Sequence, residues 1–194
     1  MINKTKFYSE VRRNLSSRLS TKQVEGFEAI LNGWDANNVV LYDLRFLAYM
    51  LATTWHETAT TMQPIEEFGR GKTKDYGRKL KMGGGSGKRI PYDKPDKLYY
   101  GRGFVQLTWY ENYEKAGKKL GVDFLNYPEL VMNLDYATDI LKLGMLEGWF
   151  TGKKLSDYFG IKTDWLNARR IINGMDKAKL IASYAKIFFK AVQF

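Results

Sequence analysis

Glu57 and Glu66 are the residues whose type and spacing best fit a chemical role. They lie nine positions apart, and Pro64 interrupts the helix expected to carry Glu57 before Glu66 is reached. The chain can therefore bend and return the second carboxylate across a cleft from the first. Hydrolysis of a glycosidic bond needs such a pair, because one acid protonates the leaving oxygen while the other activates water, at about 6.5–9.5 Å in inverting enzymes.

The helix expected to carry Glu57 has an apolar face that includes Phe46 and Met50. A carboxylate on that face loses hydration, which favours its protonated form and suits it to donate a proton. Simpler interpretations stay open at this point. Glu57 is equally explained as a helix-end carboxylate paired with a nearby arginine, and spacing alone does not choose between Glu66 and its neighbour Glu67, which both fit surface acids at the entrance of a loop.

The segment GRGFVQLTWYENY (residues 101–113) supplies groups of the kind that hold sugars. Gly101 and Gly103 permit close approach of the backbone to a ligand, and neutral polar groups and aromatic faces follow them. The polar side chains are Gln106, Thr108 and Asn112, and the aromatic ones in and beside the segment are Tyr99, Tyr100, Trp109, Tyr110 and Tyr113. Core packing explains at least half of the aromatic residues equally well, and an N-cap explains Thr108.

Several other chemistries fit the sequence poorly. His56 is the only histidine, and Thr60 stands where a zinc-protease helix needs its second one, so neither a His-rich zinc site nor a Ser-His-Asp triad built on another histidine is expected. The run Gly83–Lys88 fails as a phosphate-binding loop, because Met82 and Arg89 occupy its glycine and Ser/Thr positions. The absence of cysteine excludes a disulfide scaffold and a thiol nucleophile. We expect no metal and no cofactor.

The composition is that of a globular and strongly basic chain. Its 194 residues are 44% hydrophobic and 27% charged, with a formal net charge of +10, which indicates one domain and excludes wholesale disorder. Most of the excess lies in residues 69–102, where eleven Lys or Arg residues accompany three acids, directly after an acidic stretch over 23–68. Such a segment predicts an anionic partner, and a solvated charged face is the simpler alternative.

Helices are the main elements predicted to position these residues. A capping box at residues 20–23 opens a helix through about residue 31, and Asp43 caps the helix that carries Glu57. Another box at residues 108–111 opens a helix that Gly121 ends. Further helices are predicted over residues 135–150, 165–173 and 176–194, the last of them capped by Asp176.

Two segments depart from this helical pattern. Tyr99–Leu107 is the best candidate for a strand, and residues 70–98 form a basic, glycine-rich insert that is predicted to be a long loop. The expected fold class is therefore mainly α, with a small β or loop region. The last helix, 176–194, is basic and amphipathic, so its apolar face either packs on the core or contacts an outer membrane.

Four motifs, in their order along the chain, resemble glycoside hydrolase family 19, which contains chitinases and a branch of bacteriophage endolysins. They are WHET (55–58), PIEEFG (64–69), YYGRGFVQLTWYENY (99–113) and RRIING (169–174). The resemblance implies a lysozyme-like, two-lobed helical domain with a cleft, over residues 1–194. It further implies inverting hydrolysis of a β-1,4 linkage to an N-acetylated sugar, with Glu57 as general acid, Glu66 as general base and Thr108 holding the attacking water.

The same motifs imply which residues contact the substrate: His56, Tyr100, Arg102, Gln106, Asn112 and Asn173. The chain also departs from the plant members of that family. It reads HETATT where they read HETTGG, it lacks their cysteines, and their second carboxylate lies further along the chain than Glu66. The insert over 70–98 matches no motif of the family. The short charged N-terminus and the expected lack of a separate wall-binding domain resemble a one-domain phage endolysin more than a plant chitinase.

The expected function is that of a monomeric peptidoglycan hydrolase, which its positive charge concentrates at the anionic bacterial envelope. The charged N-terminus lacks the apolar segment of a signal peptide. We therefore expect synthesis in the host bacterial cytoplasm and action in the periplasm or cell wall after release. A chitinase is the alternative within the same chemistry. A non-catalytic binder of the envelope or of nucleic acid is the alternative of another class, although no nucleic-acid-reading motif is present and nucleic acid is not an expected partner.

Overall fold

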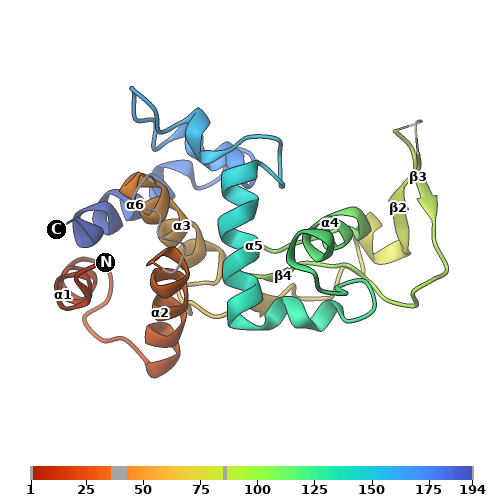
Figure 1. The fold of residues 1–194 in the computed structure, drawn as a ribbon, viewed down its shortest axis with the longest axis horizontal. Coiled ribbons are helices and arrows are strands. Elements are labelled where there is room, and N and C mark those ends of the chain that lie inside the picture. Colours follow the sequence, from red (N-terminus) through yellow and green to blue (C-terminus); the bar gives the residue numbers. More distant parts are fainter. Residues whose placement is uncertain (1, 36–42, 85–86, 194) are drawn as a thin grey trace. The chain divides into compact units, whose positions relative to one another are not determined.

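The computed structural model describes residues 2–35, 43–84 and 87–193, and it is mainly helical, which confirms the predicted fold class (Figure 1). Residues 85–86 of the insert and residue 194 of the last predicted helix lie outside the described residues. The α-helices are α1 (Lys4–Asn14), α2 (Thr21–Asp35), α3 (Leu44–Glu57), α4 (Tyr110–Leu120), α5 (Leu134–Glu147) and α6 (Ala178–Val192). Within the described ranges, no helix is both long and apolar enough to cross a membrane.

The chain divides into two compact units. One consists of residues Met1–Gln63 with Leu141–Phe194, and the other of Pro64–Ile140. We refer to them as the helical unit and the loop unit. Glu57 belongs to the helical unit and Glu66 to the loop unit, so each carboxylate is described in its own surroundings below. The assignment of residues 1–194 to one catalytic domain stays a prediction.

An aromatic cluster forms the core of the helical unit. Phe27 of α2 stacks on Trp55 of α3 with ring centroids 5.9 Å apart, and Phe188 of α6 lies 5.9 Å from Phe27. Phe7 of α1 completes the cluster, and all four rings are buried. Burying a side chain of this size contributes about 1.5–3 kcal/mol. The cluster therefore fixes α3 two residues before Glu57, the last residue of that helix.

Helix α6 turns its apolar face toward this core. Ile181, Ala185 and Phe188 are buried, and the helix packs against α1 and α3. The burial of this face agrees with the core-packing alternative, and an outer-membrane contact through 176–194 stays a prediction. The predicted cap at Asp176 is wrong, because the helix follows Lys177, whose φ of +56° breaks the helical path before it.

Two of the predicted caps at the helix N-termini are present. The Ser20 N–H donates to Gln23 Oε1 at 2.8 Å and the Gln23 N–H donates to Ser20 Oγ at 3.2 Å, which is the predicted capping box of α2. The Asp43 side chain accepts the Arg45 N–H at 2.9 Å at the start of α3. Helix α1 was not predicted, although the Asn3 side chain caps it by accepting from the Lys6 N–H at 3.0 Å.

Two other predicted helix starts are wrong. The capping box at residues 108–111 does not form, because Trp109 is the residue that precedes α4, with a φ of +75°, and its side chain does not cap the helix. Gly121 does end α4 in the left-handed conformation, as predicted. The helix predicted over 165–173 is a short 3-10 helix, η4 (Asn167–Ile171), which begins where the Asp164 side chain accepts the Asn167 N–H.

Short strands organise the loop unit. Strand β1 (Ile65–Glu66) pairs antiparallel with β4 (Arg102–Gly103), which places Glu66 opposite Arg102. Strands β2 (Leu80–Met82) and β3 (Arg89–Pro91) form an antiparallel hairpin beside α4 (Figure 1). The insert predicted to be a loop therefore contains a hairpin. The strand predicted over Tyr99–Leu107 is wrong outside β4, because the chain turns back at Gln106, where φ is +53°.

Candidate active site

Glu57 ends helix α3 in an ion pair with a buried arginine. Arg169, from η4, donates from Nη1 to Glu57 Oε1 at 2.5 Å. The Arg169 side chain is 4% exposed and that of Glu57 is 18% exposed. Arg169 is held in turn by a hydrogen bond from its Nε to the Asp176 carbonyl at 3.0 Å. The pairing of this helix-end carboxylate with an arginine is one of the interpretations that the sequence left open.

His56 and Asn173 lie in the same unit as Glu57. His56 precedes Glu57 on α3 and is half-buried, whereas Asn173 is exposed. The Asn173 N–H donates to the Arg169 carbonyl at 3.1 Å, so the residue is tied to the segment that carries the partner of Glu57. Their predicted contacts with substrate stay predictions. Arg169 itself is a site residue that sequence reasoning missed, although it is the first residue of the RRIING motif.

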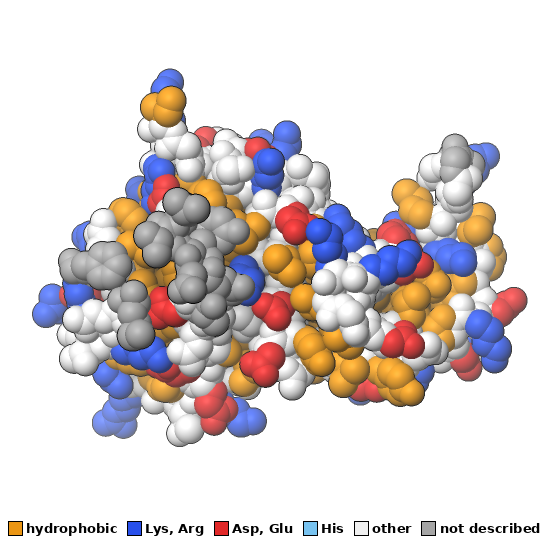
Figure 2. All heavy atoms as spheres, viewed as in Figure 1, with side chains coloured by type: hydrophobic (Ala, Val, Ile, Leu, Met, Phe, Trp, Pro, Cys, Tyr) orange, Lys and Arg blue, Asp and Glu red, His pale blue; other side chains and the backbone are white. Residues whose placement is uncertain are grey.

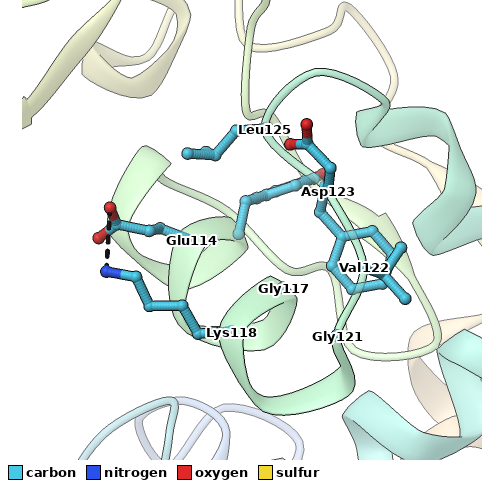
Figure 3. Close-up of a pocket in the computed structure, with 9 residues that line it drawn as sticks. Glu114, Gly117, Lys118, Gly121, Val122, Asp123 and Leu125 are labelled. Atoms are coloured by element: carbon cyan, nitrogen blue, oxygen red, sulfur yellow. Dashed lines mark ion pairs between the residues drawn. The ribbon is translucent and has the colours of Figure 1, made fainter.

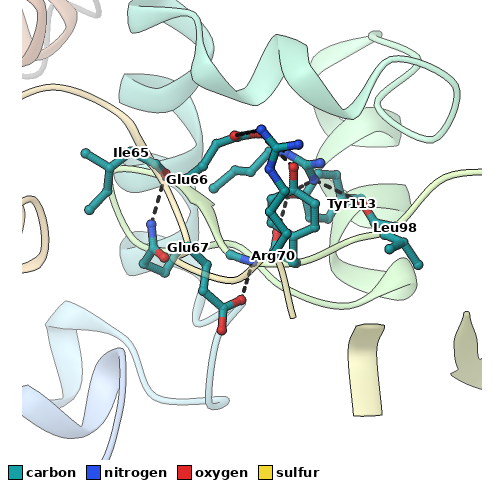
Figure 4. Close-up of polar contacts among 10 residues, drawn as sticks. Ile65, Glu66, Glu67, Arg70, Leu98 and Tyr113 are labelled. Atoms are coloured by element: carbon teal, nitrogen blue, oxygen red, sulfur yellow. Dashed lines mark hydrogen bonds and ion pairs between the residues drawn. The ribbon is translucent and has the colours of Figure 1, made fainter. Parts of the chain in front are cut away.

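Glu66 is surrounded by three donors within the loop unit (Figure 4). Its Oε1 accepts the Tyr100 hydroxyl at 2.8 Å and Arg102 Nε at 3.3 Å. Its Oε2 pairs with Arg70 Nη2 at 3.3 Å. The side chain remains 35% exposed, so the carboxylate is held in place while one side stays open to water.

The surroundings of Glu66 keep it ionised. Burial alone would raise the pKa of this carboxyl, but the hydrogen bonds from Tyr100 and Arg102 and the positive charges of Arg102 and Arg70 outweigh burial and hold the pKa of Glu66 below its usual value. Glu66 therefore carries a negative charge at neutral pH. An ionised carboxylate that can still reach water has the properties required of a general base.

Arg102 is the central support of this arrangement. Its buried guanidinium stacks on the Tyr100 ring at 3.6 Å from the centroid. Its Nη1 donates to the Leu98 carbonyl at 3.1 Å and to the Tyr113 hydroxyl at 3.0 Å. Sequence reasoning assigned Tyr100 and Arg102 to substrate contact. The structure shows that both hold the Glu66 carboxylate, and their contact with substrate stays a prediction.

Glu67 has a different environment from Glu66. Its backbone N–H donates to the Gly101 carbonyl at 2.7 Å, and its Oε2 accepts the Gly101 N–H at 3.2 Å. Its Oε1 accepts the Tyr76 hydroxyl at 2.7 Å. Burial, with the hydrogen bond to Glu67, raises the pKa of Tyr76 to about 12, so this hydroxyl keeps its proton. Both Glu67 oxygens join the segment around β1 to its neighbours, and Glu67 is half-buried whereas Glu66 is exposed, which favours Glu66 as the reactive member of the pair.

The polar residues of the 101–113 segment also support the backbone. Gln106 donates from Nε2 to the Ile65 carbonyl at 3.0 Å, directly before Glu66. Asn112 donates from Nδ2 to the Thr108 carbonyl at 2.8 Å. Thr108 is half-buried and precedes α4. The roles implied for Gln106, Asn112 and Thr108 toward substrate and water stay predictions.

A comparison with known families decides what kind of domain this is. The sequence model of glycoside hydrolase family 19, described as chitinase class I, matches residues 26–151. The chain belongs to glycoside hydrolase family 19. Chitinase C from Streptomyces griseus HUT6037 shares the fold of this family 19 chain, with a TM-score of 0.61 at 20% identity over 96% of this chain and 76% of that one.

Relatives of this family 19 chain include plant proteins that match it over short segments. An endochitinase of Arabidopsis thaliana is 40% identical over 87 residues, 45% of this chain and 30% of that protein. Endochitinase 1 of Theobroma cacao is 54% identical over 37 residues, 19% of this chain and 12% of that protein. An inactive chitinase-like protein of Hevea brasiliensis is 57% identical over 37 residues, with the same shares. The chain thus spans less than a third of the length of these relatives.

The insert of this family 19 chain is anchored to the start of α4. The Arg89 guanidinium of β3 lies over the Trp109 ring and pairs with Glu111 at 3.0 Å. Tyr76 meets the same Trp109 ring edge-on, with centroids 5.4 Å apart. Because Tyr76 also donates to Glu67, the insert connects α4 with the residue that follows Glu66. No sequence motif indicated this connection.

A hollow in the surface of the loop unit lies beside α4 (Figure 3). It has a volume of about 340 Å³ and is formed by α4 and the segment that follows that helix. An ion pair between Glu114 and Lys118, at 3.2 Å, borders it. Tyr113, one of the aromatic residues of the 101–113 segment, lines this hollow, but none of the residues predicted to catalyse or to contact substrate does, so we assign it no role.

Proposed function

We propose that this family 19 domain hydrolyses β-1,4 glycosidic bonds of the peptidoglycan glycan strand by an inverting mechanism, with Glu57 as general acid and Glu66 as general base. The observation that carries the proposal is the environment of Glu66. Three donors hold this carboxylate ionised and oriented while one side stays open to water, as a general base requires.

In the proposed reaction, Glu66 removes a proton from a water molecule whose oxygen attacks the anomeric carbon. Thr108, by its resemblance to the Ser/Thr of the family, helps to hold this water. The bond from the anomeric carbon to the bridging oxygen breaks as the new bond to the water oxygen forms, which inverts the configuration at that carbon. Glu66 is protonated at the end of the step and returns its proton to solvent.

Glu57 supplies the other proton in this mechanism. It protonates the bridging oxygen, so that the leaving sugar departs as a neutral hydroxyl. Arg169 fixes the carboxyl at the end of α3 and then stabilises the carboxylate that remains after proton transfer. Water from solvent reprotonates Glu57 and completes the cycle.

The choice of peptidoglycan rests on charge. The chain carries a formal net charge of +10, and residues 69–102 hold the largest share of it. In Figure 2, Lys and Arg side chains are spread over the face in view, which suits attraction to an extended anionic envelope. The proposal includes action as a monomer on the wall, after release from the host cytoplasm. Chitin is the second candidate substrate, because the similar Streptomyces griseus protein is a chitinase and two of the plant relatives are endochitinases.

Glutamate-to-glutamine variants test the catalytic roles. Glu57→Gln and Glu66→Gln should each lower the release of new reducing ends from purified peptidoglycan by about 10²-fold or more. Glu67→Gln is the matched control and should keep at least about a tenth of the activity, because an amide oxygen can still accept one of its two bonds. Loss confined to Glu67→Gln would overturn the assignment of the base. Full release of reducing ends by Glu57→Gln would overturn the assignment of the acid. An unmutated chain that binds the glycan but releases no reducing ends would show that it acts as a binder.

Substrate preference needs a separate measurement. Purified peptidoglycan and chitin are digested in parallel, and mass spectrometry identifies the sugar at each new reducing end. Cleavage of peptidoglycan at either of its two β-1,4 linkages supports the proposal. Rapid turnover of chitin with no change in bacterial walls would make chitin the substrate.

A further inference from the structure

Phe68 is a fully exposed aromatic side chain two residues after Glu66. Its exposure is 103% of that of an unfolded reference, so the ring makes almost no contact with the protein. Burial of a phenylalanine contributes about 1.5–3 kcal/mol to stability, and this residue contributes none of it. A single exposed apolar residue is common by itself. The backbone around Phe68 is what distinguishes it.

A tight turn holds Phe68 away from the core. The Arg70 N–H donates to the Glu67 carbonyl at 3.1 Å, and Gly69 has a φ of +83°, as the third residue of a type II turn requires. Phe68 is the second residue of this turn. Glu67, the residue before Phe68, is fixed by the hydrogen bonds of its backbone and side chain to Gly101. The ring therefore projects from an anchored turn and not from a loose loop.

The surroundings of Phe68 indicate what would cover the ring. Two residues of extended chain span at most about 7 Å, so the Phe68 backbone lies within the length of one or two sugar rings of the Glu66 backbone. Arg70, in the same turn, reaches back to Glu66. Hydrogen-bonding groups and an aromatic face thus occur together. A pyranose ring has the matching chemistry, because it offers hydroxyls at its edge and C–H groups on its face.

We infer that Phe68 is a sugar-binding platform on which the C–H face of a pyranose ring of the glycan stacks, beside the bond that Glu66 hydrolyses. This inference rests on the proposed function and names a binding residue for it. A second copy of the chain or a lipid surface would need a wider apolar patch than one ring. Phe68 is flanked by Glu67 and Gly69, with Glu66 and Arg70 next to them, and these neighbours favour a polar ligand with one apolar face.

Binding measured without turnover tests the platform. In a Glu57→Gln background, which keeps the glycan intact, titration calorimetry with peptide-free glycan strands and with the N-acetylglucosamine hexamer gives the Kd of each. Phe68→Ala should raise the Kd of the glycan that binds by about 3- to 10-fold. Phe68→Trp should restore binding to within about twofold of the parent, and Phe68→Leu should not, because it lacks a flat ring.

Ile161→Ala is the matched control, because Ile161 is 106% exposed but belongs to the helical unit and is aliphatic. The Kd of the Ile161→Ala protein should stay within about twofold of the Kd of the Glu57→Gln background. This margin is smaller than the effect expected for one lost stacking contact. With Glu57 intact, the loss caused by Phe68→Ala should fall on KM more than on kcat. If Phe68→Ala in the Glu57→Gln background binds as that background does, while the unmutated chain cleaves glycan, this inference alone is overturned. An unmutated chain that neither binds nor cleaves either glycan would overturn both the proposed function and this inference.

Discussion

The two candidate catalytic carboxylates are held in opposite ways. Glu57 is the last residue of the 14-residue helix α3, whose Trp55 packs in the buried aromatic cluster. One buried arginine, Arg169, contacts the Glu57 carboxylate. Glu66 lies in a two-residue strand between turns, and its carboxylate is shared by Tyr100, Arg102 and Arg70. A helix needs few side-chain contacts to orient its last residue. A short strand needs several, because little regular structure restrains it.

This difference predicts how each carboxylate responds to the loss of a partner. Among the described residues, Arg169 is the one partner of the Glu57 carboxylate, so its removal leaves an uncompensated charge that is largely buried, whereas removal of one donor from Glu66 leaves two others. The loss of stability should therefore be largest at Arg169 in the helical unit. It should be smallest where the Tyr100 hydroxyl contacts Glu66. Three variants test this order.

Arg169→Met should have the largest effect on stability. It breaks the ion pair with Glu57 and the bond to the Asp176 carbonyl, and the loss of one partner of a buried pair costs about 3 kcal/mol of the free energy of unfolding. Urea unfolding measures this loss. The double variant with Glu57→Gln should recover part of it, because no unpaired charge then remains. A loss below about 1 kcal/mol would contradict the importance given to this pair.

Gly101→Ala should have an intermediate effect in the loop unit. A Cβ at this position would lie 2.7 Å from Gln106 Oε1 and 3.3 Å from Glu67 Cβ, so Gln106 must shift and weaken its bond to the Ile65 carbonyl. We expect a loss of about 1–2 kcal/mol by thermal or urea unfolding, together with reduced hydrolysis. Gly84→Ala in the same unit meets no atom within 4 Å and is the matched control. Equal stability of the two variants would refute the close packing inferred at Gly101.

Tyr100→Phe should have the smallest effect on stability, about 1 kcal/mol, and a clear effect on pH dependence. Its hydroxyl helps to keep the pKa of Glu66 low, so the variant has a higher pKa at that carboxyl. Because the base must be ionised, the acidic limb of the kcat/KM profile should move to higher pH. The stability contributed by this bond is present at neutral pH and is lost as the pH falls through the pKa of Glu66 in the folded state.

A matched control accompanies that profile. Tyr127→Phe alters an exposed tyrosine of the same unit and should leave the acidic limb unchanged. An identical acidic limb in Tyr100→Phe and the parent would mean that Glu66 does not act as the base or that Tyr100 does not control it. Glu66→Gln separates these two explanations, since it abolishes hydrolysis only in the second case.

Local signals in the sequence predicted what local contacts decide. The Ser20–Gln23 capping box and the Asp43 cap involve residues two or three positions apart, and both form as predicted. Predictions failed where a residue far away in the sequence replaced a nearby residue as the interaction partner. Glu111, expected to cap α4, instead pairs with Arg89 of the insert, 22 positions earlier in the chain.

The candidate site shows the same division. The residue types and spacing pointed to Glu57 and to Glu66 or Glu67, but their partners could not be read from spacing. Arg169 lies 112 positions from Glu57, and Tyr100 lies 34 positions from Glu66. The different tasks of Glu66 and Glu67 emerge only once these distant groups are in place, because two neighbouring glutamates are alike until their surroundings differ.

The pairing of β1 with β4 has a consequence for how this chain can change in evolution. Glu66 and Arg102 are 36 positions apart, and their pairing closes the intervening segment into a loop. Doubling the length of a flexible closed loop adds only about 0.6 kcal/mol of closure entropy. Residues can therefore be added or removed at the tip of the β2–β3 hairpin at little thermodynamic cost, while the two ends of the loop keep Glu66 beside Arg102.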